Sequence, residues 1–420
     1  MEILAGRALG SKLGTSLCTS LGARSMLHGL LLALPLLLSG CASMNGEDAQ
    51  PPAVEQPLAG EPGQPKRIMV FLDGTRNDAG SGTNVRKLFD AVVAAKDPQT
   101  TSLYIEGVGS AETPLLGSGL GFGMEPRILR GYDFIAQAYR PGDEVFLFGF
   151  SRGAHSARAL AGLLAYAGVP PAAMDDRAAR LKRHNRIIEI VKGKNDRDFE
   201  SAWRAWRPGA EPVVAKEVGT RLAIVTIPVE IAFLGVWDTV PGSAFKTFGN
   251  CRELADRRDG DRYKSDSYPP IRRIFHAVSL DEKRSKFRPL LLCPALAPAH
   301  TELGEVWFPG AHADIGGGYE DAQGLSNISL QWMVAKLGAH YAPRLTTLSE
   351  PSFAADPLGI AHWSIGDRPA NLLSDCEDRR PPPGAVSDPA VAARIAAGTA
   401  RVRMHGVIES KPYPLSCSGK

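Results

Sequence analysis

The stretch EVFLFGFSRGAHSARALAGLLAYAG, from Glu144 to Gly168, decides the fold class. Its first residues, through Phe148, are β-branched, aliphatic or aromatic, as in a buried strand, and the alanines and leucines near its end recur at helical spacing. Between them, Gly149, Ser151 and Gly153 form the pattern G-x-S-x-G, in which the glycines make room for a strained turn that raises the serine hydroxyl. This context predicts that Ser151 is a nucleophile; the alternative is a small residue at a structural turn.

The same alternation of strands and helices recurs on both sides of this stretch. Short apolar runs indicate strands at 68–72 and in the segments SLYIEGVGS, VEIAFLGVWDTV and GEVWFPGAHADIGGGY. Apolar residues at helical spacing indicate helices over 83–95 and 126–139. The pattern predicts one α/β domain over 66–340, with a mostly parallel sheet and helices on both faces.

Two charged segments interrupt the alternation, at about 171–215 and 244–272. We interpret them as helical insertions that face solvent, with a lid over the site as the alternative. Residues 341–420 are rich in proline and weakly periodic, so we expect an extension packed on the domain and predict no elements in it. The large apolar residues of the first insertion either pack in the core or line an acyl groove: Ile187, Ile188, Ile190, Trp203 and Trp206.

The first 41 residues are expected to be an export signal rather than part of the fold. Basic residues precede the apolar stretch MLHGLLLALPLLLSGC, which is short for a permanent membrane anchor. Its end, LSGC, resembles the lipobox of bacterial lipoproteins, so Cys41 is predicted to carry lipid, and Ala42 favours the outer membrane. Residues 42–65 predict a flexible tether. We expect an outer-membrane lipoprotein facing the periplasm; the alternatives are a plain secretory signal and an uncleaved helix.

Composition narrows the class of protein. The chain has 420 residues, of which 44% are hydrophobic and 22% charged, enough to form a large core. Its formal net charge of +3 argues against a dedicated nucleic-acid surface. Once the signal is set aside, four cysteines remain, and in an oxidising compartment they allow three disulfide pairings: Cys251, Cys293, Cys376 and Cys417. None lies in a close C-x-x-C pair, so a zinc knuckle is not expected.

A nucleophilic serine needs a base and an acid that orients the base. In α/β-hydrolases both follow the serine, each at the carboxyl end of a later strand. Asp238 follows the apolar run IAFLGVW and His312 follows EVWFPGA, so the sequence predicts a Ser151, Asp238, His312 triad. Asp314, two residues after His312, is a supporting residue that either orients His312 in place of Asp238 or caps the turn that follows.

The other histidines near these segments fit the role of base less well. His155 lies one helical turn beyond Ser151 and is expected to point away from it and to pack in the interior. His276 and His300 do not follow a predicted strand and are interpreted as ordinary surface or half-buried histidines.

An oxyanion hole needs backbone N–H groups that point at the developing negative charge. The N–H of Arg152, directly after the nucleophile, is one expected donor, and Gly74 or Thr75 in the loop after the first strand supplies the other. Asp73 would repel an oxyanion there. We therefore expect it to support the loop by turning inward to bind backbone, alongside Asn77.

Six blocks of the sequence, in order over residues 66–340, are similar to the domain of unknown function 2235, which includes Tle1-like type VI secretion lipase effectors. The resemblance implies an α/β-hydrolase acting as a phospholipase, with Ser151, Asp238 and His312 as the triad and no cofactor or metal. The export signal departs from injected effectors, which carry none, so no secretion or immunity partner is assigned. The matching blocks are FLDGTRND…TNV, YIEGVGS, FLFGFSRGAHSAR, FLGVWDTV, HAVSLDEKRSKFRP and WFPGAHADIGGGY.

The predicted function is hydrolysis of acyl esters, of phospholipids or lysophospholipids, by a serine enzyme tethered to a membrane through its lipid anchor. A second hypothesis is a metal site for phosphodiester hydrolysis built from Asp73, Asp238, His312 and Asp314. A third is a non-catalytic envelope lipoprotein that uses the same scaffold to bind a partner.

Overall fold

The computed structural model describes the chain over residues 53–59, 63–107, 124–172, 176–241, 264, 266–365 and 374–418. The predicted export signal with Cys41, the first part of the tether and most of the 244–272 insertion lie outside these residues. Within them, no helix is long and apolar enough to cross a membrane.

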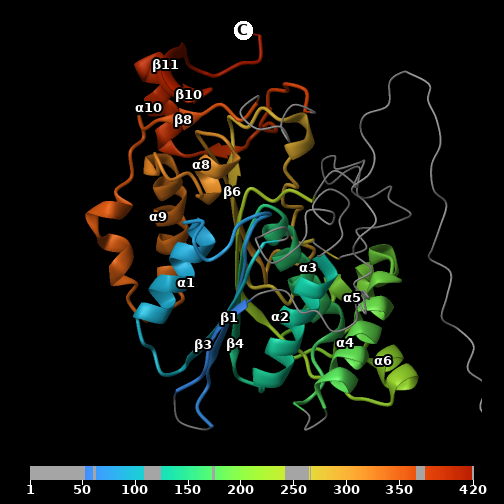
Figure 1. Ribbon diagram of the computed structural model, residues 1–420. Helices are drawn as coiled ribbons and strands as arrows, with labels where there is room; N and C mark the ends of the chain where they lie inside the picture. The colour runs from blue at the N-terminus through green and yellow to red at the C-terminus, as the bar shows by residue number, and fades with distance from the viewer. Residues whose placement is uncertain are drawn as a thin grey trace, which may run out of the picture. The chain divides into compact units, whose positions relative to one another are not determined.

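An eight-stranded sheet forms the centre of the domain, in the order β1-β3-β2-β4-β5-β6-β7-β9 (Figure 1). All neighbouring strands are parallel except the β1/β3 pair, which confirms the predicted α/β class with a mostly parallel sheet. The strands are β1 (Ala53–Gln56), β2 (Arg67–Leu72), β3 (Thr100–Ile105), β4 (Glu144–Phe150), β5 (Ile231–Trp237), β6 (Arg273–Ser279), β7 (Glu302–Phe308) and β9 (Val386–Ser387).

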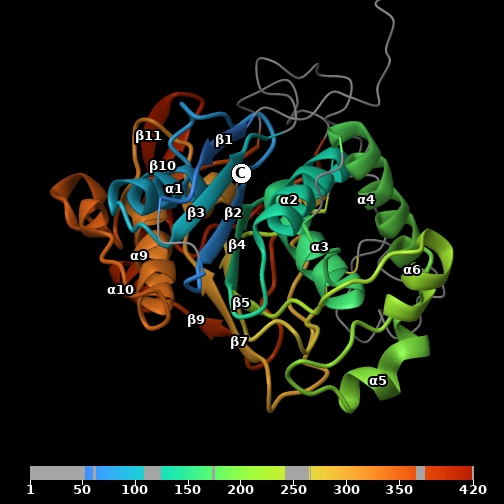
Figure 2. The same ribbon diagram turned by 90° about the horizontal axis from the view of Figure 1, so that it is seen from below.

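Side-chain alternation along each strand builds a core on both faces of this sheet. In β2, Ile68 and Val70 pack with the helices of one face, whereas Met69 and Phe71 pack with those of the other. Figure 2 shows α2 and α3 against the first face and α1 and α9 against the second. These helices are α1 (Asn84–Ala94), α2 (Met124–Ala138), α3 (Arg152–Ala167) and α9 (Gly324–Gly338).

The 171–215 insertion adds a second layer outside α2 and α3. Its helices are α4 (Arg177–Lys192), the short η2 (Asp196–Phe199) and α5 (Glu200–Arg204), followed by α6 (Ala215–Leu222). Trp203 is 1% exposed and packs on Tyr166 of α3 with ring centroids 5.1 Å apart. The five large apolar residues named above are all buried in the core on this face, so the core-packing alternative is correct for them.

Both ends of the described chain contain structure that the sequence did not predict. Residues 53–56 lie in the predicted tether but pair antiparallel with β3 as the edge strand β1, which shortens the tether. The C-terminal extension contributes β9 and a three-stranded sheet in the order β11-β10-β8, near the carboxyl ends of the central strands (Figure 1). Its elements are η4 (Thr346–Ser349), η5 (Pro351–Phe353), β8 (Ala361–His362), α10 (Pro389–Ala397), β10 (Thr399–Met404) and β11 (Val407–Pro412).

Candidate active site

Ser151 occupies a strained turn between β4 and α3. Its backbone angles are φ 57° and ψ −125°, a conformation that costs a non-glycine residue energy and is typical of nucleophile elbows. The flanking glycines are required by space, because a Cβ on Gly153 would lie 2.0 Å from the Leu72 carbonyl oxygen. The Ser151 N–H donates to the carbonyl of Trp237 at 3.0 Å, which ties the elbow to the end of β5. The strain and this bond favour a nucleophile over an ordinary turn.

Asp238 follows β5 directly and is fully buried. Its Oδ1 accepts a hydrogen bond from the Ser279 N–H at 3.0 Å, and its Oδ2 lies 2.5 Å from His312 Nδ1. The main chain of Asp238 is fixed as well, since its N–H donates to the Ala277 carbonyl at 2.7 Å. Strand β6 therefore holds the acid against the base from two directions.

His312 begins the short helix α8 (His312–Gly316), which follows β7. Its imidazole lies between the rings of Phe150 and Phe287, at centroid distances of 4.6 and 5.1 Å, and Phe150 directly precedes Ser151. Its Nε2 has no hydrogen-bond partner in the described part of the chain and is available to a serine hydroxyl. Burial lowers the pKa of His312, and Asp238 opposes this only in part, so the imidazole is neutral at neutral pH and can act as a base.

Arg379 also binds Asp238, and this contact was not predicted from the sequence. Its Nη1 donates to Asp238 Oδ1 at 2.6 Å and its Nη2 to Asp238 Oδ2 at 3.0 Å, a two-pronged ion pair. Burial alone would raise the pKa of Asp238, but Arg379 and His312 hold it well below its usual range. Nothing in the sequence around Arg379 distinguishes it from the neighbouring Arg380, and it lies far from the recognised blocks.

Asp73 turns inward, as expected, at the end of β2. It is fully buried and accepts hydrogen bonds from Thr83 Oγ1 at 2.5 Å, Tyr104 OH at 2.8 Å and Asn77 Nδ2 at 3.3 Å. Burial raises the pKa of Asp73, and these donors offset part of that effect. The Asp73 carboxylate thus holds the loop that follows β2 through hydrogen bonds and does not point at an oxyanion.

The loop after β2 lies against the nucleophile, but its two predicted donors are not equivalent. A Cβ on Gly74 would lie 3.1 Å from Ser151 Cβ, so this loop borders the elbow. The Gly74 N–H, however, donates to Asp73 Oδ1 at 2.6 Å, which makes it a poor oxyanion donor and corrects that prediction. The Thr75 N–H has no hydrogen-bond partner among the described residues, and Thr75 Oγ1 is buried without one there. Of the two predicted donors in this loop, Thr75 is the one whose N–H is not already bound within the described residues.

Asp314 binds groups other than the His312 imidazole. Its Oδ2 accepts from the N–H groups of Ala311 and His362, both at 2.9 Å, and its Oδ1 lies 2.7 Å from His362 Nδ1. It caps α8 and binds β8, and Asp238 is the carboxylate that contacts His312. Burial alone would lower the pKa of His362, but Asp314 and Asp321 together raise it. The His362 imidazole is thus paired with these two carboxylates.

His276 is not the surface or half-buried residue that its sequence suggested. It is fully buried in β6, with Nδ1 2.9 Å from Glu305 Oε2, and its Nε2 accepts from the Thr239 N–H at 3.1 Å. His155 is fully buried in α3, as predicted, and does not belong to the triad.

The four residues of the hypothetical metal site do not converge. Asp73 is bound by loop donors, Asp238 by His312 and Arg379, and Asp314 by His362. Within the described ranges, no cluster of three or more histidine, cysteine, aspartate or glutamate side chains could hold a metal ion. The geometry therefore argues against the metal hypothesis.

A family model for the catalytic domain of Tle1-like type VI secretion phospholipase effectors matches residues 66–336. The chain belongs to this family. The match runs from β2 into α9, so it includes β2 to β7 of the central sheet but not β1 or β9, and it ends before the extension that carries Arg379. In this chain the elbow with Ser151 follows β4, Asp238 follows β5 and His312 lies in α8, after β7.

Individual relatives match only part of this chain and part of their own length. The uncharacterized protein YEL023C of Saccharomyces cerevisiae is 26% identical over 247 residues, which are 54% of this chain and 33% of the yeast protein. An uncharacterized Pseudomonas aeruginosa structure is 18% identical with a TM-score of 0.38, covering 70% of this chain and 49% of that one. A Tle1 effector bound to the VgrG spike of the type VI secretion system is 19% identical with a TM-score of 0.31, covering 63% and 52%. The chain thus spans a third to about half of the length of these relatives.

Proposed function

We propose that this protein is a membrane-tethered phospholipase that cleaves an acyl ester through an acyl-serine intermediate. The observation that carries the proposal is the arrangement of the triad. Ser151 stands in an elbow conformation beside the Thr75 loop, and His312 Nδ1 is bound to Asp238 at 2.5 Å with Nε2 left for the nucleophile. These are the parts that acyl transfer by a serine enzyme needs.

The reaction follows from the roles of the three side chains. Ser151 Oγ attacks the ester carbonyl carbon and gives its proton to His312 Nε2, while Asp238 stabilises the imidazolium. The N–H groups of Arg152 and Thr75 bind the oxyanion. His312 then passes the proton to the departing alkoxide. A water molecule attacks the acyl-serine, leaves a proton on His312 and releases the fatty acid.

Two arginines next to the oxyanion donors support an anionic substrate. Arg76 is exposed and follows Thr75, and Arg152 follows the nucleophile. Burial, followed by the nearby charge of Arg76, lowers the pKa of Arg152 to about 10. The two guanidinium groups are therefore close enough to repel each other. Two positive charges near the nucleophile suit the phosphate of a glycerophospholipid, which lies a few bonds from its acyl esters.

The tether is proposed from the sequence alone. A lipid on Cys41 would hold the enzyme at a bilayer and raise its effective concentration toward membrane lipids. Mass spectrometry of the mature N-terminus tests this step: a chain that begins at a diacylated Cys41 is expected. Any unlipidated N-terminus would leave an exported hydrolase without an anchor.

The experiment for the function as a whole is release of fatty acid from phospholipid vesicles by the purified protein. Wild-type protein should release long-chain fatty acid, and Ser151→Ala should not. The rate should exceed that on butyryl esters of neutral alcohols. If the wild-type protein cleaved only short soluble esters, the enzyme would be an esterase with the same triad, and the phospholipase proposal would be wrong.

A further inference from the structure

Arg379 lies in the C-terminal extension, outside the matched catalytic domain, yet contacts the buried acid of the triad. Its side chain is 6% exposed and that of Asp238 is fully buried. Beyond the two bonds to Asp238, its guanidinium donates to the carbonyls of Ser279, at 2.7 Å, and Phe287. Phe287 is also a ring neighbour of His312. The guanidinium thus joins the acid to the segment that contacts the base.

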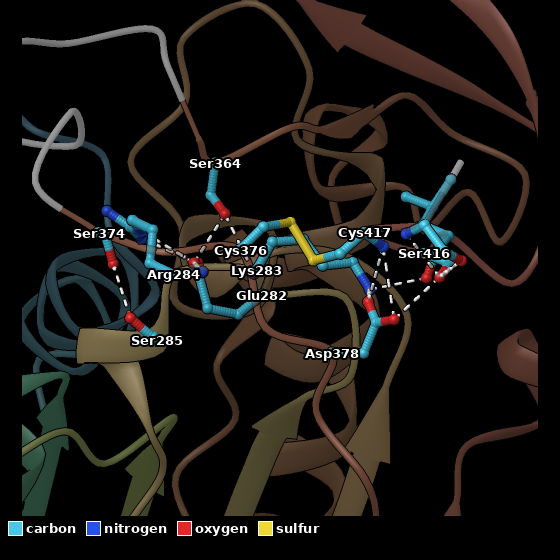
Figure 3. The surroundings of a disulfide bond; sticks show 12 residues. Glu282, Lys283, Arg284, Ser285, Ser364, Ser374, Cys376, Asp378, Ser416 and Cys417 are labelled. Atoms are coloured by element: carbon cyan, nitrogen blue, oxygen red, sulfur yellow. Dashed lines mark hydrogen bonds and ion pairs between the residues drawn. A yellow bond between two sulfur atoms is a disulfide. The ribbon is translucent and has the colours of Figure 1, made fainter. Parts of the chain in front are cut away.

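A disulfide holds the segment that carries Arg379. Cys376, three residues before Arg379, is bonded to Cys417 near the end of the chain (Figure 3). Asp378 lies between Cys376 and Arg379 and accepts the Cys417 N–H at 3.1 Å and Lys283 Nζ at 2.9 Å. Figure 3 shows this carboxylate beside the disulfide. Cys293 is also disulfide-bonded. The Cys376–Cys417 pairing is one of the pairings that the sequence left open.

The extension is fastened to the chain just after β6 as well. Lys283 Nζ donates to the Leu415 carbonyl at 2.7 Å, and the Glu377 N–H donates to the Lys283 carbonyl at 2.8 Å. Leu415 and Glu377 lie on the two arms that the disulfide joins. Without the disulfide these contacts would have to hold two chain segments, 41 residues apart in sequence, with no covalent link.

The charge of Arg379 affects the pKa of His312 through Asp238. A carboxylate buried without a cation attracts a proton or an imidazolium more strongly than one that is already paired. Loss of Arg379 would remove the cation bound to Asp238, so that more of the Asp238 charge would act on His312 and raise the pKa of the imidazole, while Arg284 would continue to lower that pKa and Glu282 to raise it. Loss of Arg379 would also remove two of the hydrogen bonds that fix the Asp238 carboxylate oxygens. Arg379 thus affects both the orientation and the basicity of His312.

We infer that Arg379 is a positioning residue of the triad and that the Cys376–Cys417 disulfide keeps it in place, so that full hydrolytic activity requires the oxidised C-terminal extension. The inference rests on the proposed serine-hydrolase function and adds a requirement to it. The enzyme is then less active wherever this disulfide is not formed.

The test compares Arg379→Gln with Arg380→Gln, which removes an exposed arginine at the next position. For each variant, kcat and KM on an ester substrate are measured against pH, together with the melting temperature. Arg379→Gln should lower kcat at pH 7 by about 10–100-fold, as small misplacements of catalytic groups do, with KM little changed. The acid limb of its kcat/KM profile should move to higher pH, and Arg379→Lys should restore part of that limb position. Arg380→Gln should match the wild type.

A second arm tests the disulfide. Cys376→Ser should lower kcat and shift the acid limb in the same direction, but should add little when made in the Arg379→Gln background, because both changes act through one contact. Full activity and an unchanged profile in Cys376→Ser would overturn the requirement for the disulfide. A wild-type profile in Arg379→Gln, or an equal loss at every pH, would overturn the positioning role. Inactive Ser151→Ala with active wild type, measured alongside, keeps either result separate from failure of the hydrolase proposal.

Discussion

His276 Nε2 accepts a hydrogen bond at 3.1 Å from the N–H of Thr239, the residue that follows Asp238. For Nε2 to accept, the ring proton must be on Nδ1, where it is donated to Glu305 at 2.9 Å. A histidine buried in β6 thus accepts a hydrogen bond from the backbone next to Asp238. We therefore expect His276 to act through this backbone and not to touch the substrate.

Replacement of His276 by leucine should destabilise the protein. The buried Thr239 N–H and the partly exposed Glu305 carboxylate would each lose a partner, and an unsatisfied buried group costs about 1–3 kcal/mol. The measurement is the free energy of unfolding in urea, with His276→Gln as the control because its amide oxygen can still accept. If the leucine variant were as stable as the glutamine variant, the Thr239 bond would contribute little.

Asp238 and Asp314 both lie near His312, and their variants show which of them is the acid of the triad. Asp238→Asn should lower kcat by about 10⁴-fold, since the amide favours the wrong imidazole tautomer, whereas Asp314→Asn should cost far less because Asp314 binds Ala311 and His362. Steady-state kinetics of the two variants, with melting temperatures to compare their folding, decide the matter. A crippled Asp314→Asn beside an active Asp238→Asn would assign the acid to Asp314.

The pH profile should report the buried His312. The base works only when neutral, so kcat/KM falls as the pH drops through the pKa of His312. Because burial lowers that pKa from its usual 6.5, activity should be constant across neutral pH and decline only at lower pH. The measurement is kcat/KM from pH 4 to pH 9. An acid limb above pH 7 would mean that the imidazole is not held neutral as its surroundings imply.

Arg76 should matter for charged substrates only. Arg76→Gln should lower kcat/KM on an anionic phospholipid by about tenfold, the value of one charge-assisted hydrogen bond, and leave a neutral ester unaffected. Arg140→Gln is the matched control, since Arg140 is an exposed arginine just before β4, at the opposite end of the strand from Ser151. Equal losses on both substrates would assign Arg76 a structural role.

The three residues of the proposed triad could be placed from the sequence because Ser151 and Asp238 directly follow strands, and His312 comes four residues after one, whose apolar patterns can be read in the sequence. Ser151 has its glycines, and Asp238 and His312 end apolar runs, so a parallel sheet brings all three to one edge. Arg379 carries no such signal. Its role depends on a disulfide and on a segment whose weak periodicity predicts no element. The Gly74 donor failed for a local reason, because the neighbouring Asp73 carboxylate binds its N–H.

The most direct test of the account is covalent labelling of the purified protein with a fluorophosphonate, followed by peptide mapping. Only a serine activated by a base in an oxyanion site reacts efficiently with this probe. We expect a single label on Ser151, absent in Ser151→Ala and formed much more slowly in His312→Ala. A label on another residue, or an active enzyme that resists the probe, would contradict the triad on which every other proposal depends.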